Sequence, residues 1–199
     1  MLTRGPMSFE QILMKCGAPA LCGIKSASLF SMNFDIYGNG SDKLEELMSY
    51  FSALGIFIIP IQKKDNRMLF FVYNKKLLKE SCSSEKALKY LKQKKYPVER
   101  GFDSILLELL SRLMTGENFP HEVGFFLGYP LDDVIQFEVQ HGSGFKFCGD
   151  WKVYGNIEEA LVRMNEYKNC RNYCSRQLEK GIAIPQVALN YRNQIKNYK

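Results

Sequence analysis

The sequence predicts an α+β protein, with a small three-stranded antiparallel sheet packed with helices in the N-terminal half and a largely helical C-terminal half. Two short apolar runs around a polar connection predict the sheet, and apolar stripes behind capping motifs predict the helices. Of the 199 residues, 46% are hydrophobic and 24% are charged, which is typical of a folded globular chain. We expect a single domain over residues 1–199, or two lobes with a boundary near 96–102.

The first helix is predicted over residues 8–16. Ser8 and Gln11 form a capping box, and apolar residues follow at the i, i+3, i+4 and i+7 spacing of one helix face. Gly17 and Pro19 should end this helix, because both residue types disfavour a helix interior.

Three apolar stretches predict the strands of the sheet. Small, β-branched and apolar residues over 21–34 predict the first strand, and a turn is expected at 37–40. The runs 56–61 and 68–73 are separated by a polar connection and predict a buried hairpin. We expect this hairpin to pair with the first strand.

Further capping motifs predict the remaining helices. Asp42 with Glu45 begins a helix that ends near Gly55, and Asn156 with Glu159 begins a long one. Prolines at first helical positions and glycines just past the last ones predict the other boundaries. The helices expected in the C-terminal half span 84–95, 103–116, 120–127, 130–140, 156–180 and 185 onward.

No segment has the length of a membrane span or the pattern of a signal peptide. The longest apolar run, 53–61, is far short of the roughly 20 residues that a spanning helix needs. The N-terminal residues lack a continuous apolar segment followed by a small-residue cleavage site. We therefore expect a cytoplasmic protein without a membrane partner, whose six cysteines stay reduced thiols.

The net charge of +6 is distributed unevenly, with a net +8 over residues 61–100 and a net −6 over 101–150. The lysines of the 84–95 helix could meet phosphates, but they equally fit the solvated face of a helix whose other face carries Ala87 and Leu91. A nucleic-acid partner is not expected, because the segment has neither interleaved aromatic residues nor a known module signature.

Cys170 and Cys174 lie four residues apart on one face of the predicted long helix, close enough to chelate one ion together. A zinc or iron–sulfur site needs two more ligands, which only the fold could supply. The possible donors are Cys16, Cys22, Cys82, Cys148, His121 and His141. Without any Cys-x-x-Cys pair, buried apolar thiols are the favoured interpretation, and we assign no metal site.

His121 and Glu122 follow a proline at a predicted helix N-terminus, where the helix dipole favours a carboxylate and lowers the pKa of an imidazole. The pair could act as a base, or be a dipole partner and a surface residue. Cys16 near a helix C-terminus is disfavoured as a nucleophile, because that position raises the pKa of a thiol. No catalytic signature is complete, so neither an enzymatic activity nor a cofactor is assigned.

Residues 145–155 place four aromatic side chains, one thiol and two lysines between glycines. This segment fits the wall of a binding site, with rings for a flat ligand and lysines for its anionic groups. It equally fits an edge hairpin that fills a core with aromatic side chains. Cys148 is the thiol that we expect to be functional, because it lies outside the predicted helices and near two lysines.

Four segments carry a family resemblance: CGAP at 16–19, GIKSASLF at 23–30, FPHEVGFFLGYPLDDV at 119–134 and CGDWKVYG at 148–155. They resemble a domain-of-unknown-function family of about this length from clostridia and related anaerobes. The resemblance extends over nearly the whole chain.

This resemblance implies no established activity. It places Cys16 among the signature residues, whereas Cys22 and Cys174 look particular to this chain, which argues against Cys170 and Cys174 as a family-wide chelate. Iron-uptake and flavodoxin genes near members of the family imply a link to iron or redox metabolism.

Two hypotheses of function follow. In the first, a cleft built by the signature segments binds a small anionic ligand or a metal-linked cofactor. The lysines would hold anionic groups, the aromatic side chains would stack, and the imidazole and carboxylate would move protons or ligate. The candidate residues are Lys25, His121, Glu122, Cys148, Trp151, Lys152 and Tyr154.

The second hypothesis is a non-enzymatic module for protein interaction or structure. Its working surface would be the basic 61–100 segment or the C-terminal helix. The many glycines and prolines of the signature segments fit a requirement for shape as well as one for reactivity.

Overall fold

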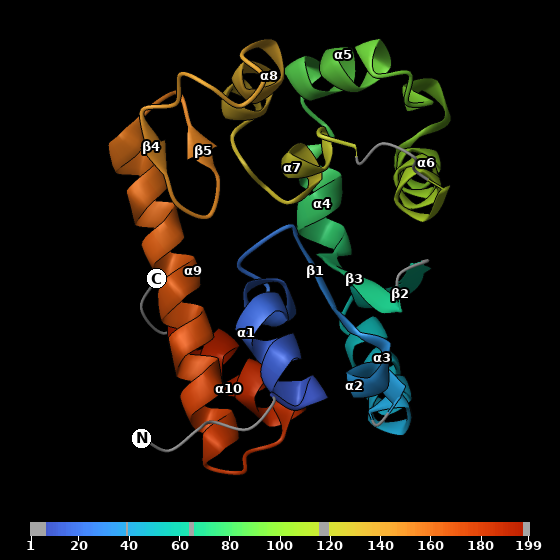
Figure 1. The fold of residues 1–199 in the computed structure, drawn as a ribbon, viewed down its shortest axis with the longest axis vertical. Helices are drawn as coiled ribbons and strands as arrows, with labels where there is room; N and C mark the ends of the chain where they lie inside the picture. Colours follow the sequence, from blue (N-terminus) through green and yellow to red (C-terminus); the bar gives the residue numbers. More distant parts are fainter. Residues whose placement is uncertain (1–6, 39, 64–65, 116–119, 197–199) are drawn as a thin grey trace. The chain divides into compact units, whose positions relative to one another are not determined.

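The computed structural model describes residues 7–38, 40–63, 66–115 and 120–196, which form two compact units (Figure 1). Unit 1 contains the described residues up to Lys75 and those from Glu166 onward, and unit 2 contains Lys76–Asn165. Each unit is described by itself below. That the chain folds as a single domain, or divides near 96–102, stays a prediction.

Unit 1 contains a three-stranded antiparallel sheet, as predicted. Its strands are β1 (Ala27–Asn33), β2 (Ile56–Lys63) and β3 (Arg67–Asn74), in the order β1-β3-β2. The central strand β3 is buried from Met68 to Tyr73, which explains its uninterrupted apolar sequence. Pro60 is tolerated in β2 because an edge strand can lack one N–H donor.

Helices cover this sheet and complete the core of unit 1. They are α1 (Phe9–Leu21), α2 (Phe34–Gly38), α3 (Ser41–Ser52), the second part of α9 (Ile157–Glu179), and α10 (Ile184–Lys196). Helix α1 contacts β1 and β3, α3 contacts β2, and α10 contacts both α1 and α3. The largest fully buried side chains of this core include Phe51 and Phe70.

The predicted start of α1 is correct and its predicted end is wrong. The Ser8–Gln11 capping box is present, but the helix continues through Gly17 and Pro19 to Leu21. Gly17 and Pro19 are buried in the core of unit 1, and Gly17 lies next to the Phe30 ring. Burial against the sheet outweighs the backbone hydrogen bond that proline cannot make. The first strand consequently starts at Ala27 rather than near residue 21.

Two local predictions around residue 40 are also wrong. The expected turn at 37–40 is replaced by helix α2 up to Gly38, and residue 39 lies outside the described residues. Asp42 and Glu45 do not form a capping box, because α3 begins after Gly40 and has no side-chain cap. A β-carbon on Gly40 would lie 2.8 Å from Phe9, so close packing on α1 fixes this helix start.

Unit 2 is mainly helical and includes a small hairpin. Its elements are α4 (Lys75–Ser81), α5 (Glu85–Gln93), the 3-10 turn Val98–Arg100, α6 (Phe102–Thr115), α7 (Val123–Phe126), α8 (Leu131–Val139), β4 (Phe147–Cys148), β5 (Lys152–Val153) and the first part of α9. On α5, Lys86, Lys89 and Lys92 are exposed while Ala87 and Leu91 are buried, as expected for a solvated face.

Two of the predicted helices are shorter in the structure, and one predicted end is not described. Residues 120–122 form a turn before α7, and Pro130 lies just before α8 rather than inside it. Gly116, the expected end of the helix from residue 103, lies outside the described residues. Among the described helices, none is long and apolar enough to cross a bilayer.

Candidate metal centre

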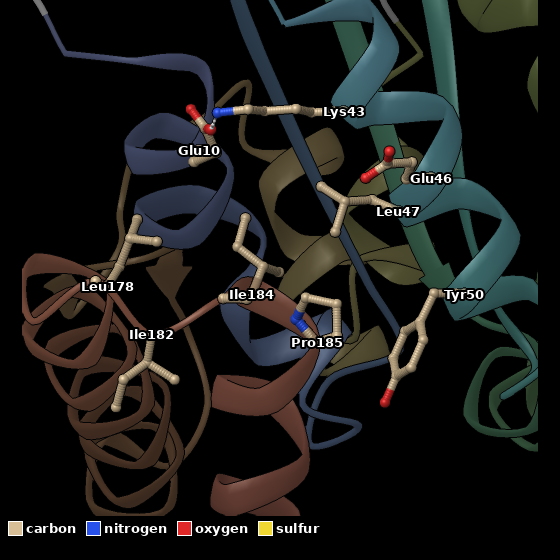
Figure 2. Close-up of a pocket in the computed structure, with 11 residues that line it drawn as sticks. Glu10, Lys43, Glu46, Leu47, Tyr50, Leu178, Ile182, Ile184 and Pro185 are labelled. Carbon is tan, nitrogen blue, oxygen red and sulfur yellow. Dashed lines mark hydrogen bonds and ion pairs between the residues drawn. The ribbon is translucent and has the colours of Figure 1, made fainter.

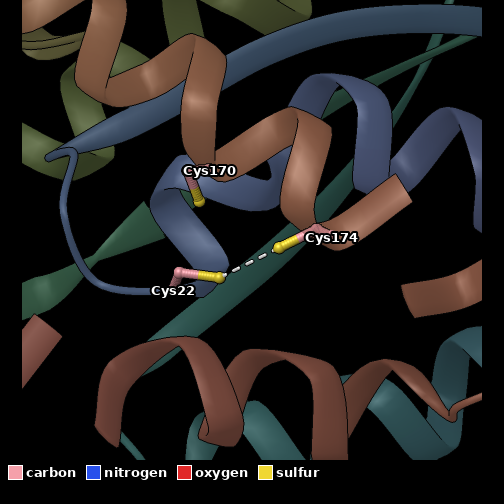
Figure 3. A group of neighbouring side chains, drawn as sticks. All are labelled: Cys22, Cys170 and Cys174. Atoms are coloured by element: carbon pink, nitrogen blue, oxygen red, sulfur yellow. Dashed lines mark hydrogen bonds between the residues drawn. The ribbon is translucent and has the colours of Figure 1, made fainter. Parts of the chain in front are cut away.

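Three cysteines come together in unit 1. Cys22 directly follows the last residue of α1, and Cys170 and Cys174 lie one turn apart on α9. Their sulfur atoms point toward one another (Figure 3) and all lie within 4.8 Å of one another. The Sγ atoms of Cys22 and Cys174 are 3.6 Å apart.

The three thiols are enclosed by the core of unit 1. Cys22 is 1% exposed, and the other two have no exposed surface. Leu21 and Val187, from α1 and α10, are buried in the same core. An ion bound here would therefore have sulfur donors in an apolar, water-poor environment, where thiolate–metal bonds are not weakened by competing water.

Contacts between the thiols separate their pKa values. Hydrogen bonds from Cys170 and Cys22 lower the pKa of the Cys174 thiol. The pKa of Cys170 is raised, because it donates to Cys174 and Cys22 and is buried. The hydrogen bond from Cys170 lowers the pKa of Cys22. The hydrogen bond between Cys22 and Cys174, together with the burial of Cys22, outweighs this effect, so the pKa of Cys22 is raised. The cluster thus favours one thiolate, which is the form that binds metals.

Two residues of α10 lie next to the cluster. The Tyr191 hydroxyl is hydrogen-bonded to Cys170, and its pKa is raised mainly by burial and further by the three cysteines. The Arg192 Nη2 atom donates to the Leu21 carbonyl at 2.6 Å, one residue before Cys22. A neutral phenol and a guanidinium therefore border the three sulfurs.

The seven residues proposed from the sequence divide between the units. Lys25 belongs to unit 1, where it is buried and its Nζ lies 5.2 Å from the centre of the Tyr167 ring. The other six belong to unit 2. Their role in binding an anionic ligand stays a prediction.

Trp151 and Tyr154 are held by one carboxylate of unit 2. Asp133, near the start of α8, is buried and accepts bonds from Trp151 Nε1 and from the backbone N–H groups of Tyr154 and Gly155, each at 2.8 Å. The Trp151 ring also stacks on Tyr129 with ring centres 5.1 Å apart. These contacts fasten the β4–β5 hairpin to α8. For Trp151 and Tyr154, these contacts fit the alternative of a hairpin that fills a core with aromatic side chains.

Glu122 belongs to a buried ion-pair network. Its Oε1 accepts from Arg112 Nη1 at 2.8 Å and from the Tyr96 hydroxyl at 3.1 Å. Arg112 also binds Glu108 and the Lys94 carbonyl and lies over the Tyr96 ring. This network gives Glu122 a structural role in unit 2.

His121 and Lys152 both contact the Phe137 ring. The imidazole and phenyl centres are 5.5 Å apart, and the Lys152 Nζ is 5.6 Å from the phenyl centre while it donates to the Gly142 carbonyl at 2.7 Å. Cys148 is exposed on β4. Of the predicted residues, His121 and Lys152 thus lie at one ring, that of Phe137, which was not among the predicted residues.

Comparison with known proteins gives a family for the chain. A family model described as "Protein of unknown function (DUF3793)" matches residues 13–188. The chain belongs to this family. The match confirms the resemblance to a domain-of-unknown-function family, and the matched residues include the three clustered cysteines. No curated protein and no solved structure matches the chain.

In this DUF3793 chain, helix spacing pairs Cys170 with Cys174 but does not single out the third thiol, Cys22. Cys22 was one of six possible additional donors, and 152 residues separate it from Cys174. A signal was present in the chain, because Cys22 lies at the end of a helix whose apolar face had to pack somewhere. Only the packing of α1 against α9 selects Cys22 from the six.

Unit 1 also contains a hollow that the sequence did not predict. It has a volume of about 550 Å³ and lies between α3 and the connection from α9 to α10 (Figure 2). Leu47, Leu178 and Ile184 contribute apolar walls, and the Glu10–Lys43 ion pair lies at its edge. This hollow could accept an apolar group.

Proposed function

We propose that the protein binds one thiophilic metal ion through Cys22, Cys170 and Cys174. A single observation carries this proposal: two segments far apart in the chain bring three buried sulfur atoms to within 4.8 Å of one another. Chelation needs this convergence, whereas isolated buried thiols that only fill space do not.

The spacing of the sulfurs supports a single ion. Metal–sulfur bonds to zinc are about 2.3 Å long, so three sulfurs about 4 Å apart would surround one ion at bonding distance. Thiolates are soft ligands that select Zn²⁺, Cu⁺ or iron over Mg²⁺ and Ca²⁺. The burial of all three sulfurs favours ion binding over catalysis at this centre, because catalytic sites keep one position open to substrate.

Several features that were named from the sequence stay predictions. They are the cytoplasmic location, the link to iron or redox metabolism, and the binding of an anionic ligand by the residues named from the sequence. An interaction surface on the basic segment or on the C-terminal helix also stays a prediction. The ion-binding proposal is compatible with each of them and does not depend on any.

Anaerobic titration with Cd²⁺ tests the proposal. The full chain is purified with its thiols reduced, freed of metal, and titrated while the ultraviolet thiolate-to-cadmium charge-transfer band is followed. We expect the band to saturate at one equivalent of ion. Elemental analysis of protein purified without chelators then shows whether zinc, copper or iron occupies the centre.

Serine variants identify the ligands. Cys22→Ser, Cys170→Ser and Cys174→Ser should each weaken Cd²⁺ binding by at least about tenfold, because a hydroxyl is a poor ligand for a soft ion. Cys82→Ser is the matched control, because Cys82 is also buried but lies in unit 2, outside the cluster. No charge-transfer band with the wild-type chain, or an equal loss in the control, would overturn the proposal.

A further inference from the structure

Arg192 is a half-buried cation whose guanidinium lies beside the chain segment that carries Cys22. Its Nη2 donates to the Leu21 carbonyl, while its Nε is buried and has no hydrogen-bond partner. Within the described part of the chain, no carboxylate forms an ion pair with Arg192. A half-buried guanidinium with one buried, unpartnered nitrogen is costly, so a nearby anion would stabilise it.

The thiol cluster is the neighbouring source of negative charge. Burial lowers the pKa of Arg192, and Cys22 acts in the opposite direction, with a smaller contribution from Tyr50. The guanidinium lies next to Cys22, because its Nη2 bonds to the Leu21 carbonyl and its Nε lies beside Gly23, the residues on either side of Cys22. Arg192 therefore lies where it responds to the charge on the sulfurs.

The charge of the complex depends on the ion. A divalent ion held by three thiolates carries one excess negative charge, which one guanidinium neutralises. A monovalent ion would leave two negative charges, and trivalent arsenic forms a neutral tris-thiolate. Burial in the core disfavours any uncompensated charge.

We propose that the centre is built for a divalent thiophilic cation, with Arg192 as the positively charged residue that balances its tris-thiolate complex. This inference rests on the proposed function. Arg192 does not contact the ion in this arrangement. Its positive charge favours a divalent ion over a monovalent or a trivalent one, because the divalent complex carries the single negative charge that one guanidinium neutralises.

Paired titrations with Cd²⁺ and arsenite test the inference. Cd²⁺ displaces the thiol protons and leaves an anionic complex. Arsenous acid condenses with three thiols, releases three waters and leaves a neutral complex. Arg192→Gln removes the charge while keeping an N–H donor for the Leu21 carbonyl. We expect this variant to bind Cd²⁺ about tenfold or more weakly than the wild-type chain does. Its affinity for arsenite should stay within about threefold of wild type.

Two further variants serve as controls. Arg192→Lys keeps the charge and should keep both affinities within about threefold. Arg176→Gln removes the same charge from an exposed residue of α9 and should change neither, because solvent screens it. Circular dichroism verifies that each variant is folded. If the glutamine variant does not fold, the lysine variant still decides, since a selective loss of Cd²⁺ in it would overturn the inference.

The outcomes separate the two proposals. Equal weakening of Cd²⁺ and arsenite by Arg192→Gln means that Arg192 only supports the local structure, and an unchanged Cd²⁺ affinity means that its charge has no part. Either result overturns this inference and leaves the ion-binding proposal standing. Failure of the wild-type chain to bind both ions overturns the proposed function itself.

Discussion

Residue environments divide the six thiols into classes of different reactivity. All six lie in the described residues, and among them Cys148 is exposed, Cys16 is half-buried and the other four are buried. Burial raises the pKa of Cys16, and it raises that of Cys82 to about 12. A reagent must reach the sulfur to react with it, so accessibility favours reaction at Cys148.

We predict that Cys148 is the first cysteine to react with a neutral alkylating reagent in the folded, reduced protein. Cys16 should follow more slowly, and Cys82 should react only on unfolding, because its thiol is both protonated and inaccessible. Peptide mapping by mass spectrometry after short labelling times gives the order. Labelling of Cys16 or Cys82 before Cys148 would contradict this assignment.

At the level of elements, one carboxylate joins two pieces of unit 2. Asp133 belongs to α8, and its three donors come from the turn of the β4–β5 hairpin and from the two residues that follow β5. The hairpin has only two paired residues on each strand, so its own hydrogen bonds cannot hold it in place. Its conformation depends on the contact with α8.

Asp133→Ala should lower the free energy of unfolding by about 3 kcal/mol, because two buried donors and one part-buried donor lose their acceptor at about 1 kcal/mol each. Urea unfolding followed by tryptophan fluorescence measures this, since Trp151 is the single tryptophan of the chain and donates to Asp133. Asp132→Ala is the control. Its carboxylate is 71% exposed and pairs with Lys86, which is worth about 1 kcal/mol at most. Equal losses in the two variants would show that the Asp133 bonds add nothing.

In the whole chain, the three-cysteine cluster joins distant segments. Cys22 and Cys174 are 152 residues apart, and all of unit 2 lies between them in the sequence. An ion bound by both closes a long loop and exists only in the folded state. Its binding energy therefore adds to the stability of unit 1.

We predict that Cd²⁺ at a hundred times its dissociation constant raises the unfolding free energy by about 2.7 kcal/mol. The effect should decrease as the pH falls, because Cys22 and Cys170 have raised pKa values and must release protons to bind the ion. Because two protons are displaced, the affinity for Cd²⁺ falls by about a hundredfold for each unit by which the pH is lowered. Thermal unfolding with and without Cd²⁺ over a range of pH measures this.

Cys174→Ser provides the control for this measurement and should show no Cd²⁺-dependent stabilisation at any pH. A stabilisation that is independent of pH would mean that the ion binds through groups other than thiols.

The sequence by itself determined the elements that depend on contacts between near neighbours. The Ser8 cap of α1 needs only residue 11, and Asn156 caps α9 through residues 158 and 159. The hairpin of β2 and β3 follows from two apolar runs and a short connection. The family could also be identified from the sequence, because its motifs are contiguous segments.

Tertiary structure alone decided the features that depend on residues far apart in the chain. Pro19 stays inside α1, and α3 begins directly after Gly40, because packing on the sheet and on Phe9 outweighs local preference. The bonds from the hairpin to Asp133 arise in the same way. The third cysteine depends most strongly on the fold, since a helix periodicity can pair Cys170 with Cys174, whereas only the packing of a distant helix end brings Cys22 to them.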